Sequence, residues 1–453
     1  MAPTSPWRED ADLERIVQAL GAVQRVAYAP TSVYPMSAPA FVATPGAERP
    51  RPAGGRLGIY VHVPFCEYGC TFCFYAKRVG ASPERMRRYV AAAVRELGWV
   101  VPDTPLSQLY VGGGTPTSLP ADLLDELLAT VLARVRDDGQ QIHTVECSPE
   151  TATEEYLRVF RRRGIGRVSM GIQSLDDAVL DSVGRRHSGA EALVACERLV
   201  ASGLIVNVDL IYGLPRQTEA TFRGDFEAVA ARGVDAVTAY DLRINERTPV
   251  AGRLRQDERL DLARLVHWRA FVQRTADALG YRQMRWREFV RGTPASGVRK
   301  PRFEDVTSIG NQIGIGPSAR SRLGNIVYRN SADIDRYTAR VEAGQSPVEE
   351  TFLLRVEDRK ARFVALSLGD GRPLNRSEYA REFGCSVEDD YGEVLQGVLA
   401  AGLASDDGDC ISLTETGKLV YDRVTLAFYP QRARGWIEGR ELVLRRRLER
   451  HPS

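Results

Sequence analysis

Between residues 57 and 242, short β-type runs alternate with helix-length segments, and this alternation limits the possible folds more than any other feature of the sequence. A helix between two strands supplies the right-handed crossover that parallel neighbours require. We therefore predict an α/β fold built on a partial (βα)6 barrel of the TIM type. The predicted strands cover residues 57–63, 107–112, 141–146, 166–171, 204–210 and 235–242.

The chain of 453 residues is long enough for such a barrel and for further units beside it. Residues 1–55 are predicted as an N-terminal arm and residues 56–290 as the barrel. Residues 291–350 are expected to form a Gly-rich connecting segment that closes the active site. Residues 351–453 are predicted as a mostly helical domain that ends in a winged-helix-like pattern, with a role in packing or as a lid.

The charges of the chain nearly cancel, since 61 Lys and Arg residues stand against 59 Asp and Glu residues. No strong field favours nucleic acid or an anionic membrane as the partner. The N-terminal segment lacks an apolar run of signal-peptide length, and no stretch approaches the roughly 20 apolar residues of a membrane span. We expect a cytoplasmic monomer that acts on a small molecule.

Cys66, Cys70 and Cys73 follow the first predicted strand with the spacing C-x3-C-x2-C. Disulfides are rare in chains without a secretion signal, so a metal site explains this trio better. Iron–sulfur clusters usually take four Cys ligands, and three leave one iron open. The amino and carboxylate groups of S-adenosylmethionine (SAM) can chelate that iron, and an electron from the cluster then cleaves SAM to methionine and a 5′-deoxyadenosyl radical.

A structural zinc site is the alternative for this trio of cysteines. Such a site needs a fourth Cys or His at ligand spacing, and His62 lies too close to Cys66 for an ordinary zinc finger. The other four cysteines are scattered, and most of them are predicted to be buried structural thiols: Cys147, Cys196, Cys385 and Cys410.

Glycines and polar residues follow the other predicted strands, where parallel α/β folds bind their ligands. The run of glycines at 112–114 allows close approach of the backbone to a bound methionine moiety. Glu146 can pair with the ammonium group of SAM, and Asp209 can accept hydrogen bonds from ribose hydroxyls. Gln173 and Arg185 can hold a carboxylate or an adenosine edge.

Taken together, these motifs resemble those of the radical SAM superfamily, in the branch of oxygen-independent coproporphyrinogen oxidase (HemN) and its relatives. The resemblance covers about residues 57–430 and rests on YVHVPFC, GGGTPT, the strand that ends at Glu146, GRVSMGIQSLDD with GRRH, and VNVDLIYGLPRQT, in this order. It implies a HemN-type C-terminal domain, a [4Fe-4S] cluster on the three cysteines and two SAM molecules. The residues that align with the family's SAM-binding positions are Tyr60, Phe72, Gly113, Gly114, Thr115, Glu146, Gln173, Arg185, Asp209 and Asp241. His187 in GRRH is predicted to be structural.

Departures from the HemN pattern indicate the subtype. The decarboxylating oxidase has a further Cys two residues after the third ligand, where this chain has Tyr75, and this difference disfavours porphyrinogen decarboxylation. The haem-chaperone relatives also lack that Cys, but the stretches INERTPV and MRWREFV look remodelled relative to them. The segment GNQIGIGPSARSRLGNIVYRN resembles the class C radical SAM methylases of the branch. We therefore predict transfer of a C1 unit, by methylation or cyclopropanation, to an sp2 carbon of a natural product.

In class C enzymes, as the resemblance implies, two SAM molecules lie side by side and the methyl group of the second provides the carbon. Methylation also needs a proton shuttle, and Tyr240, Glu246 and Glu288 are candidates because they lie near strand ends. An external electron donor of the flavodoxin or ferredoxin type is expected. Two alternatives remain: a HemN-like decarboxylase or other hydrogen-abstracting enzyme, and a HemW-like haem-binding chaperone.

Overall fold

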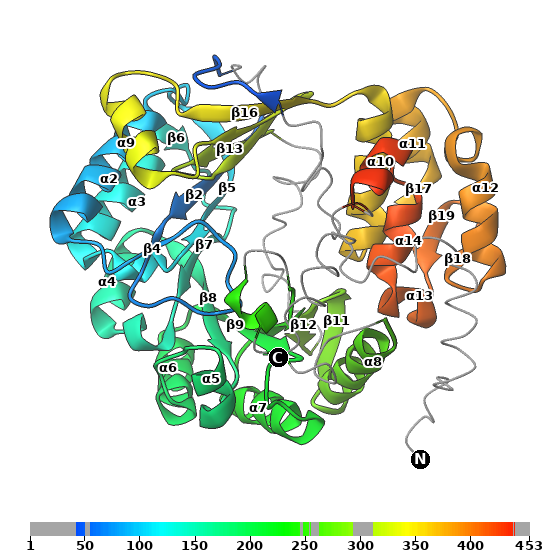
Figure 1. Cartoon of the computed structure of the whole chain (residues 1–453), viewed down its shortest axis with the longest axis horizontal. Coiled ribbons are helices and arrows are strands. Elements are labelled where there is room, and N and C mark those ends of the chain that lie inside the picture. Colours follow the sequence, from blue (N-terminus) through cyan, green and yellow to red (C-terminus); the bar gives the residue numbers. More distant parts are fainter. Residues whose placement is uncertain are drawn as a thin grey trace.

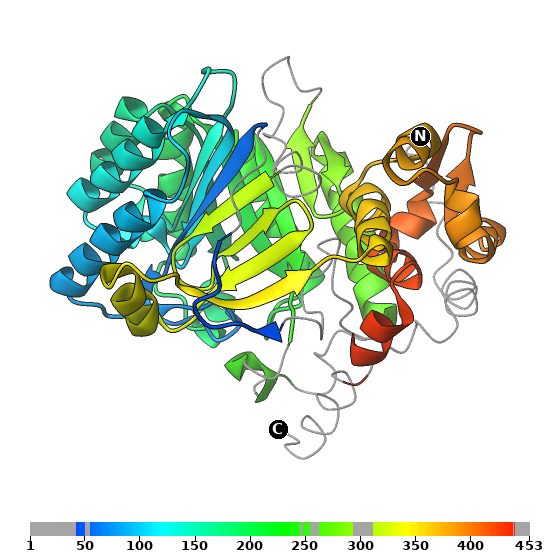
Figure 2. The same cartoon turned by 90° about the horizontal axis from the view of Figure 1, so that it is seen from above.

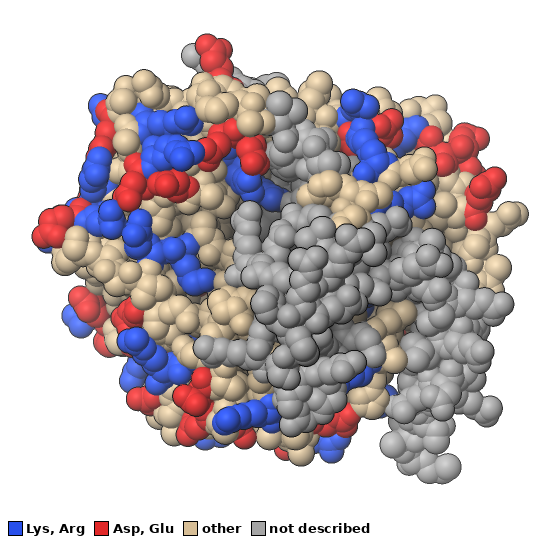
Figure 3. Space-filling model, viewed as in Figure 1, with Lys and Arg blue, Asp and Glu red and all other residues tan. Residues whose placement is uncertain are grey.

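The structure is a computed structural model that describes residues 42–49, 55–244, 248–252, 254, 262–292, 311–437 and 439. A curved sheet with helices on its outside lies beside a smaller helical unit formed by the C-terminal part of the chain (Figures 1 and 2). Within the described residues, no helix is long and apolar enough to cross a membrane. Lys and Arg are interspersed with Asp and Glu over the described part of the face in Figure 3.

The centre of the sheet consists of parallel strands in the order in which they occur in the sequence. The strands are β2 (Leu57–Val63), β5 (Thr104–Gly113), β7 (His143–Cys147), β8 (Ile165–Gln173), β9 (Ile205–Tyr212) and β10 (Ala236–Asp241). The connecting helices are α2 (Pro83–Leu97), α3 (Ala121–Arg134), α4 (Glu154–Arg162), α5 (Asp177–Ser182), α6 (Gly189–Ala201) and α7 (Glu219–Ala231). The predicted partial barrel is thereby confirmed.

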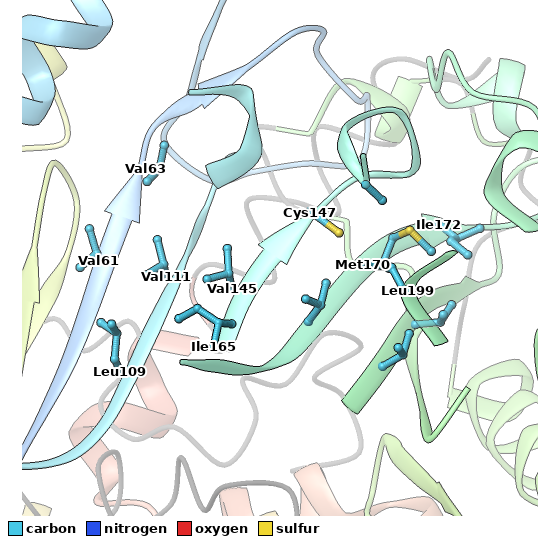
Figure 4. Close-up of a cluster of buried hydrophobic side chains, with 14 of the residues drawn as sticks. Val61, Val63, Leu109, Val111, Val145, Cys147, Ile165, Met170, Ile172 and Leu199 are labelled. Atoms are coloured by element: carbon cyan, nitrogen blue, oxygen red, sulfur yellow. The ribbon is translucent and has the colours of Figure 1, made fainter. Parts of the chain in front are cut away.

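The hydrophobic core lies between these strands and the helices outside them. Val61, Val111 and Val145 come from neighbouring strands, and each is fully buried (Figure 4). Cys147 and Cys196 belong to the same core, as predicted for structural thiols. The thiols of Cys385 and Cys410, in the C-terminal unit, are only partly buried, so the prediction holds for two of the four cysteines.

The stretch predicted as a Gly-rich loop instead forms strands that extend the sheet beyond β2. β13 (Asn311–Ile315) runs parallel to β2, and an antiparallel series follows: β14 (Arg320–Leu323), β15 (Ile326–Asn330) and β16 (Val348–Leu353). Gly314 allows the backbone of β14 to approach closely, because a Cβ at this position would lie 2.5 Å from the carbonyl oxygen of Arg320. Helix α9 (Ile334–Glu342) packs on α2.

Further short strands extend both edges of the sheet. At one edge, β1 (Val42–Ala43), from the predicted N-terminal arm, pairs with β16. At the other edge, β12 (Glu288–Arg291) pairs antiparallel with β10, and β11 (Tyr281–Arg285) pairs with β12. The two-residue strand β6 (Val135–Arg136) pairs with the start of β5.

The C-terminal unit is mostly helical, as predicted, with a small antiparallel sheet of three strands. Its elements are α10 (Val356–Ser367), β17 (Leu374–Asn375), α11 (Arg376–Phe383), α12 (Val387–Ala400), β18 (Ala404–Asp406), β19 (Cys410–Leu413), α13 (Glu415–Leu419) and α14 (Tyr421–Ala427). Helix α8 (Leu262–Ala278) joins this unit to the barrel, because its Val266 and Ala270 lie in the core of the C-terminal unit. The buried side chains of Arg269 and Asp422 form an ion pair of 3.0 Å at the same junction.

Candidate active site

The three predicted cluster ligands lie on one loop after β2. The two-residue strands β3 (Phe65–Cys66) and β4 (Arg78–Val79) pair and close this loop. All three thiols are free and partly exposed. Burial raises the pKa of Cys66 to about 11 and also raises the pKa of Cys70, and the charges of the neighbouring cysteines add to both effects. The three thiols are therefore close enough to act on one another.

The donor set of this loop fits a cubane cluster better than a single ion. Over the ranges that the structure describes, no three His, Cys, Asp or Glu side chains lie close enough to hold one metal ion together. A zinc site requires such convergence, since every ligand binds the same ion at about 2.0–2.3 Å. In a [4Fe-4S] cluster each thiolate binds a different iron, so the sulfurs stay further apart. The positive charges of Arg185 and Lys77 also favour the thiolate form of Cys70.

The glycines of GGGTPT allow the end of β5 to pack against the cysteine loop. A Cβ on Gly114 would lie 2.4 Å from the carbonyl oxygen of Phe65 and 3.0 Å from the sulfur of Cys66. Gly113 has φ +118°, and a Cβ there would lie 2.7 Å from Nδ1 of His62. No larger residue fits at Gly114 without moving the cysteine loop, or at Gly113 without moving the side chain of His62.

Glu146, next to the last residue of β7, and Asp209, in the second half of β9, bring two carboxylates to the site. Glu146 accepts hydrogen bonds from the hydroxyl of Tyr110 (2.6 Å) and the backbone N–H of Gly113 (3.1 Å). Burial raises the pKa of Glu146 to about 7, and the charge of Asp209 adds to this shift. Asp209 accepts a hydrogen bond of 2.8 Å from Asn207. Two carboxylates that act on one another in a partly buried site favour a cationic ligand.

Aromatic side chains and an arginine surround these carboxylates. The charges of Glu146 and Asp209 both raise the pKa of Tyr240, after the larger effect of burial. Tyr240 is 38% exposed, and the guanidinium of Arg287 lies 5.9 Å from the centre of its ring. Nε of Arg287 lies 3.4 Å from Oδ1 of Asp241.

Tyr60 and Tyr75 belong to the same region. Burial raises the pKa of Tyr60, and the charges of Glu146 and Tyr75 add to this shift. The hydroxyl of Tyr60 lies 3.1 Å from Nδ1 of His62. Tyr75, at the position of the additional Cys of the oxidase, is 57% exposed and stacks on Phe74. The structure therefore brings together the predicted residues Tyr60, Glu146, Asp209, Tyr240 and Asp241.

Three other predicted SAM-binding residues lie around the cysteine loop. Nη1 of Arg185 lies 3.7 Å from the sulfur of Cys70, and its Nη2 donates to the carbonyl oxygen of Gly171. The hydroxyl of Thr115 lies 3.9 Å from the sulfur of Cys66. Phe72 packs against the barrel core. Gln173, a fourth predicted residue, ends β8 with φ 79°.

The three candidate proton shuttles differ in position. Tyr240 is exposed at the end of β10. Glu288 is buried in β12 opposite Thr238, further from the strand end, and lies 3.8 Å from Arg285. Glu246 lies outside the described residues. Tyr240 is thus the shuttle candidate that the structure brings to the site.

The prediction from sequence missed His62, Tyr110 and Arg287. His62 is buried, and its Nε2 lies 2.9 Å from the carbonyl oxygen of Ala76. With Nε2 donating there, Nδ1 is free to accept from the hydroxyl of Tyr60. The period of two along a strand places His62 on the same side of β2 as Tyr60, and this signal was available in the sequence.

Comparison with known proteins shows the family to which the chain belongs. A sequence model of the radical SAM superfamily matches residues 60–229. The chain is 31% identical over 387 residues to the heme chaperone HemW of Mycobacterium tuberculosis, covering 82% of this chain and 94% of the relative. It is 29% identical over 400 residues to an oxygen-independent coproporphyrinogen III oxidase of Pseudomonas aeruginosa, covering 83% and 86%.

The coproporphyrinogen III oxidase HemN from Escherichia coli has a similar fold. Its structure matches with a TM-score of 0.72 and 23% identity, over 83% of this chain and 90% of that one. These relatives support the predicted radical SAM chemistry and the HemN-like branch, and with them a [4Fe-4S] cluster and SAM. They do not support the predicted methylase subtype.

Proposed function

Because the chain belongs to the radical SAM superfamily, in the branch of coproporphyrinogen oxidases and heme chaperones, we propose that it cleaves SAM to remove hydrogen from a small-molecule substrate. A [4Fe-4S] cluster held by Cys66, Cys70 and Cys73 would supply the electron that breaks a C–S bond of SAM. The observation that carries the proposal is that the glycine run joins the cysteine loop to the carboxylates. The N–H of Gly113 donates to Glu146, on which the charge of Asp209 acts, while Gly114 lies against the sulfur of Cys66.

Glu146 and Asp209 would bind and orient SAM, whose sulfonium and ammonium groups are both positive. Tyr110 and the N–H of Gly113 hold the Glu146 carboxylate in place through hydrogen bonds. Near pH 7 the Glu146 carboxyl is partly protonated, and a positively charged ligand beside it favours its ionised form. Asn207 donates to one oxygen of Asp209, and Oγ of Ser169 lies 3.4 Å from both oxygens, so the carboxylate is held in place for the ribose hydroxyls of SAM.

Transfer of a C1 unit from a second SAM to an sp2 carbon is the second candidate. Tyr75, 57% exposed, stands where the oxidases have their additional Cys, and Tyr240, 38% exposed, lies in the same region. The hydroxyl of Tyr240 carries a proton at neutral pH, and its exposed position in the site would allow it to donate that proton to a substrate. Methylation needs such a proton transfer.

SAM with a trideuterated methyl group tests both candidates in one experiment. The anaerobic protein, reduced with dithionite in place of the proposed flavodoxin- or ferredoxin-type donor, is incubated with labelled SAM, with and without coproporphyrinogen III. Hydrogen abstraction predicts 5′-deoxyadenosine without deuterium, and decarboxylation of the probe would also give vinyl products. C1 transfer predicts 5′-deoxyadenosine with one deuterium and an equal amount of S-adenosylhomocysteine.

The same experiment can overturn the enzymatic proposal. A protein that holds four irons per chain but forms no 5′-deoxyadenosine under any of these conditions does not cleave SAM reductively. A Soret band after addition of haem to that protein would instead point to haem carriage, the function named for the heme-chaperone relatives.

A further inference from the structure

The GRRH turn, residues 184–187, packs against the cysteine loop. The backbone N–H of Thr71 donates to the carbonyl oxygen of Val183, just before the turn, at 3.0 Å. The ring of Tyr68, between the first two cysteines, lies 5.4 Å from the guanidinium groups of both Arg185 and Arg186. The turn and the loop therefore form one packed unit, although they are more than a hundred residues apart in sequence.

The two arginines of this turn differ in what else they contact. Nη1 of Arg185 donates to the sulfur of Cys70 at 3.7 Å, while Nη2 donates to the carbonyl oxygen of Gly171. One planar guanidinium is thus fixed between the end of β8 and a predicted iron ligand. Arg186 is exposed, and the contacts found for the described residues include none between it and a cysteine.

Glu150 contacts both the turn and the cysteine loop. Its carboxylate accepts a hydrogen bond from the hydroxyl of Tyr68, and Nδ1 of His187 lies 3.4 Å from its Oε1. His187 and the carboxylate of Glu150 are largely buried. This buried position agrees with the structural role expected of the GRRH histidine, and through Tyr68 and His187 the Glu150 side chain contacts both the cysteine loop and the turn.

We propose that Arg185 raises the reduction potential of the cluster by donating a hydrogen bond to the Cys70 thiolate. Glu150, through its contact with Tyr68, helps to hold Arg185 and Cys70 next to each other. Reduction adds negative charge at the cluster, so a nearby cation and an N–H donor to a ligand sulfur stabilise the reduced form more than the oxidised form. Arg185 would thereby make electron transfer from an external donor easier. This role rests on the cluster of the proposed function and differs from the SAM contact that the resemblance implies.

The potential can be measured without SAM or substrate. The full chain, reconstituted anaerobically, is titrated with dithionite while the reduced cluster is followed by electron paramagnetic resonance, and iron is counted in parallel. Arg185→Gln should lower the midpoint potential and keep the iron. Arg186→Gln is the matched control, because it loses the same contact with the ring of Tyr68, and it should leave the potential unchanged. Tyr68→Phe keeps the ring, loses the bond to Glu150 and should lower the potential by less than Arg185→Gln.

An unchanged potential in Arg185→Gln with full iron would overturn the proposal, and so would an equal shift in Arg186→Gln. If Arg185→Gln binds no cluster, Arg185→Lys decides, because a lysine keeps the charge but cannot bond Gly171 and Cys70 with one planar fork. A lowered potential in that variant supports the proposal, and the wild-type potential contradicts it. Failure of the wild-type chain to bind a cluster would instead contradict the proposed function.

Discussion

The carboxylate of Glu146 accepts a 2.6 Å hydrogen bond from the hydroxyl of Tyr110, which lies on the neighbouring strand. The bond favours the ionised carboxylate, but burial outweighs it and raises the pKa of Glu146 to about 7. The site therefore holds a carboxyl group that titrates in the physiological range and that a cationic ligand would ionise.

Glu146→Gln should remove a pH dependence of stability. The pKa of Glu146 is raised from 4.5 to about 7 on folding, so the stabilising effect of protonation is complete below pH 4.5 and is lost as the pH rises through 7. The loss amounts to at most about 3 kcal/mol for a shift of this size. The urea concentration at the unfolding midpoint is measured for both ligand-free proteins between pH 5 and 8. As the pH rises, the midpoint of the wild type should fall relative to that of Glu146→Gln. Parallel curves would contradict the assignment.

The same variant tests binding of SAM. Affinity of the wild type should increase as the pH rises through 7, because only the ionised carboxylate places a negative charge beside the positively charged SAM. Glu146→Gln should bind about ten- to a hundredfold more weakly above pH 7, since a hydrogen bond to a charged group contributes about 1.5–3 kcal/mol. Isothermal titration calorimetry at pH 6 and 8 measures both effects. Equal affinities of the two proteins at pH 8 would exclude this contact.

Replacing Cys66, Cys70 or Cys73 by Ala should abolish the cluster, whereas the wild type should hold about four irons per chain after anaerobic reconstitution. Cys385→Ala and Cys410→Ala are suitable controls, because these thiols are partly exposed and lie in the C-terminal unit. Iron and acid-labile sulfide are counted in each protein. Loss of iron in a control variant would mean that a further ligand had been missed.

Gly114→Ala should prevent the cysteine loop from closing. Its Cβ would meet the carbonyl oxygen of Phe65 at 2.4 Å and the sulfur of Cys66 at 3.0 Å, so we expect loss of iron even though no ligand is removed. Gly224→Ala is the matched change, because nothing lies within 4 Å of its Cβ and helix α7 should gain about 1 kcal/mol. Full iron in Gly114→Ala would show that the loop has room.

Asp422→Asn should destabilise the junction of barrel and C-terminal unit by about 3–5 kcal/mol, because it leaves the buried Arg269 without its countercharge. Arg269 and Arg423 hold the pKa of Asp422 below its usual value despite burial, so in the wild type this stabilisation is present at neutral pH and is lost on strong acidification. Asp138→Asn, at the exposed ion pair with Arg56, should barely change the urea midpoint. A similar midpoint for both variants would contradict the prediction.

The barrel could be predicted from the sequence because each parallel strand is a short run of apolar and β-branched residues followed by a helical segment. Leu57–Val63 has the predicted bounds for this reason. The strands β13 to β15 were mistaken for a loop because their glycines indicate turns, whereas Gly314 and Gly316 allow other backbone to approach closely. Local composition does not distinguish these two uses of glycine.

The site was predicted as far as its residues follow strand ends within recognised motifs. Arg287 was missed because it approaches Asp241 from the turn between β11 and β12, two antiparallel strands that follow the alternating strands and helices of the barrel. The contact of Arg185 with Cys70 could not be predicted either, because it depends on how a turn after β8 packs on a loop after β2. Such contacts between distant segments depend on the tertiary fold and leave no periodic signal in the sequence.

Helix α8 places Val266 and Ala270 in the core of the C-terminal unit and Arg269 against Asp422. On the ribosome this helix emerges about 150 residues before its partner. Until α14 has been made, the nascent barrel therefore exposes an apolar helix face and an arginine that lacks its countercharge. Chaperones or proteases that recognise such a surface would act within this interval.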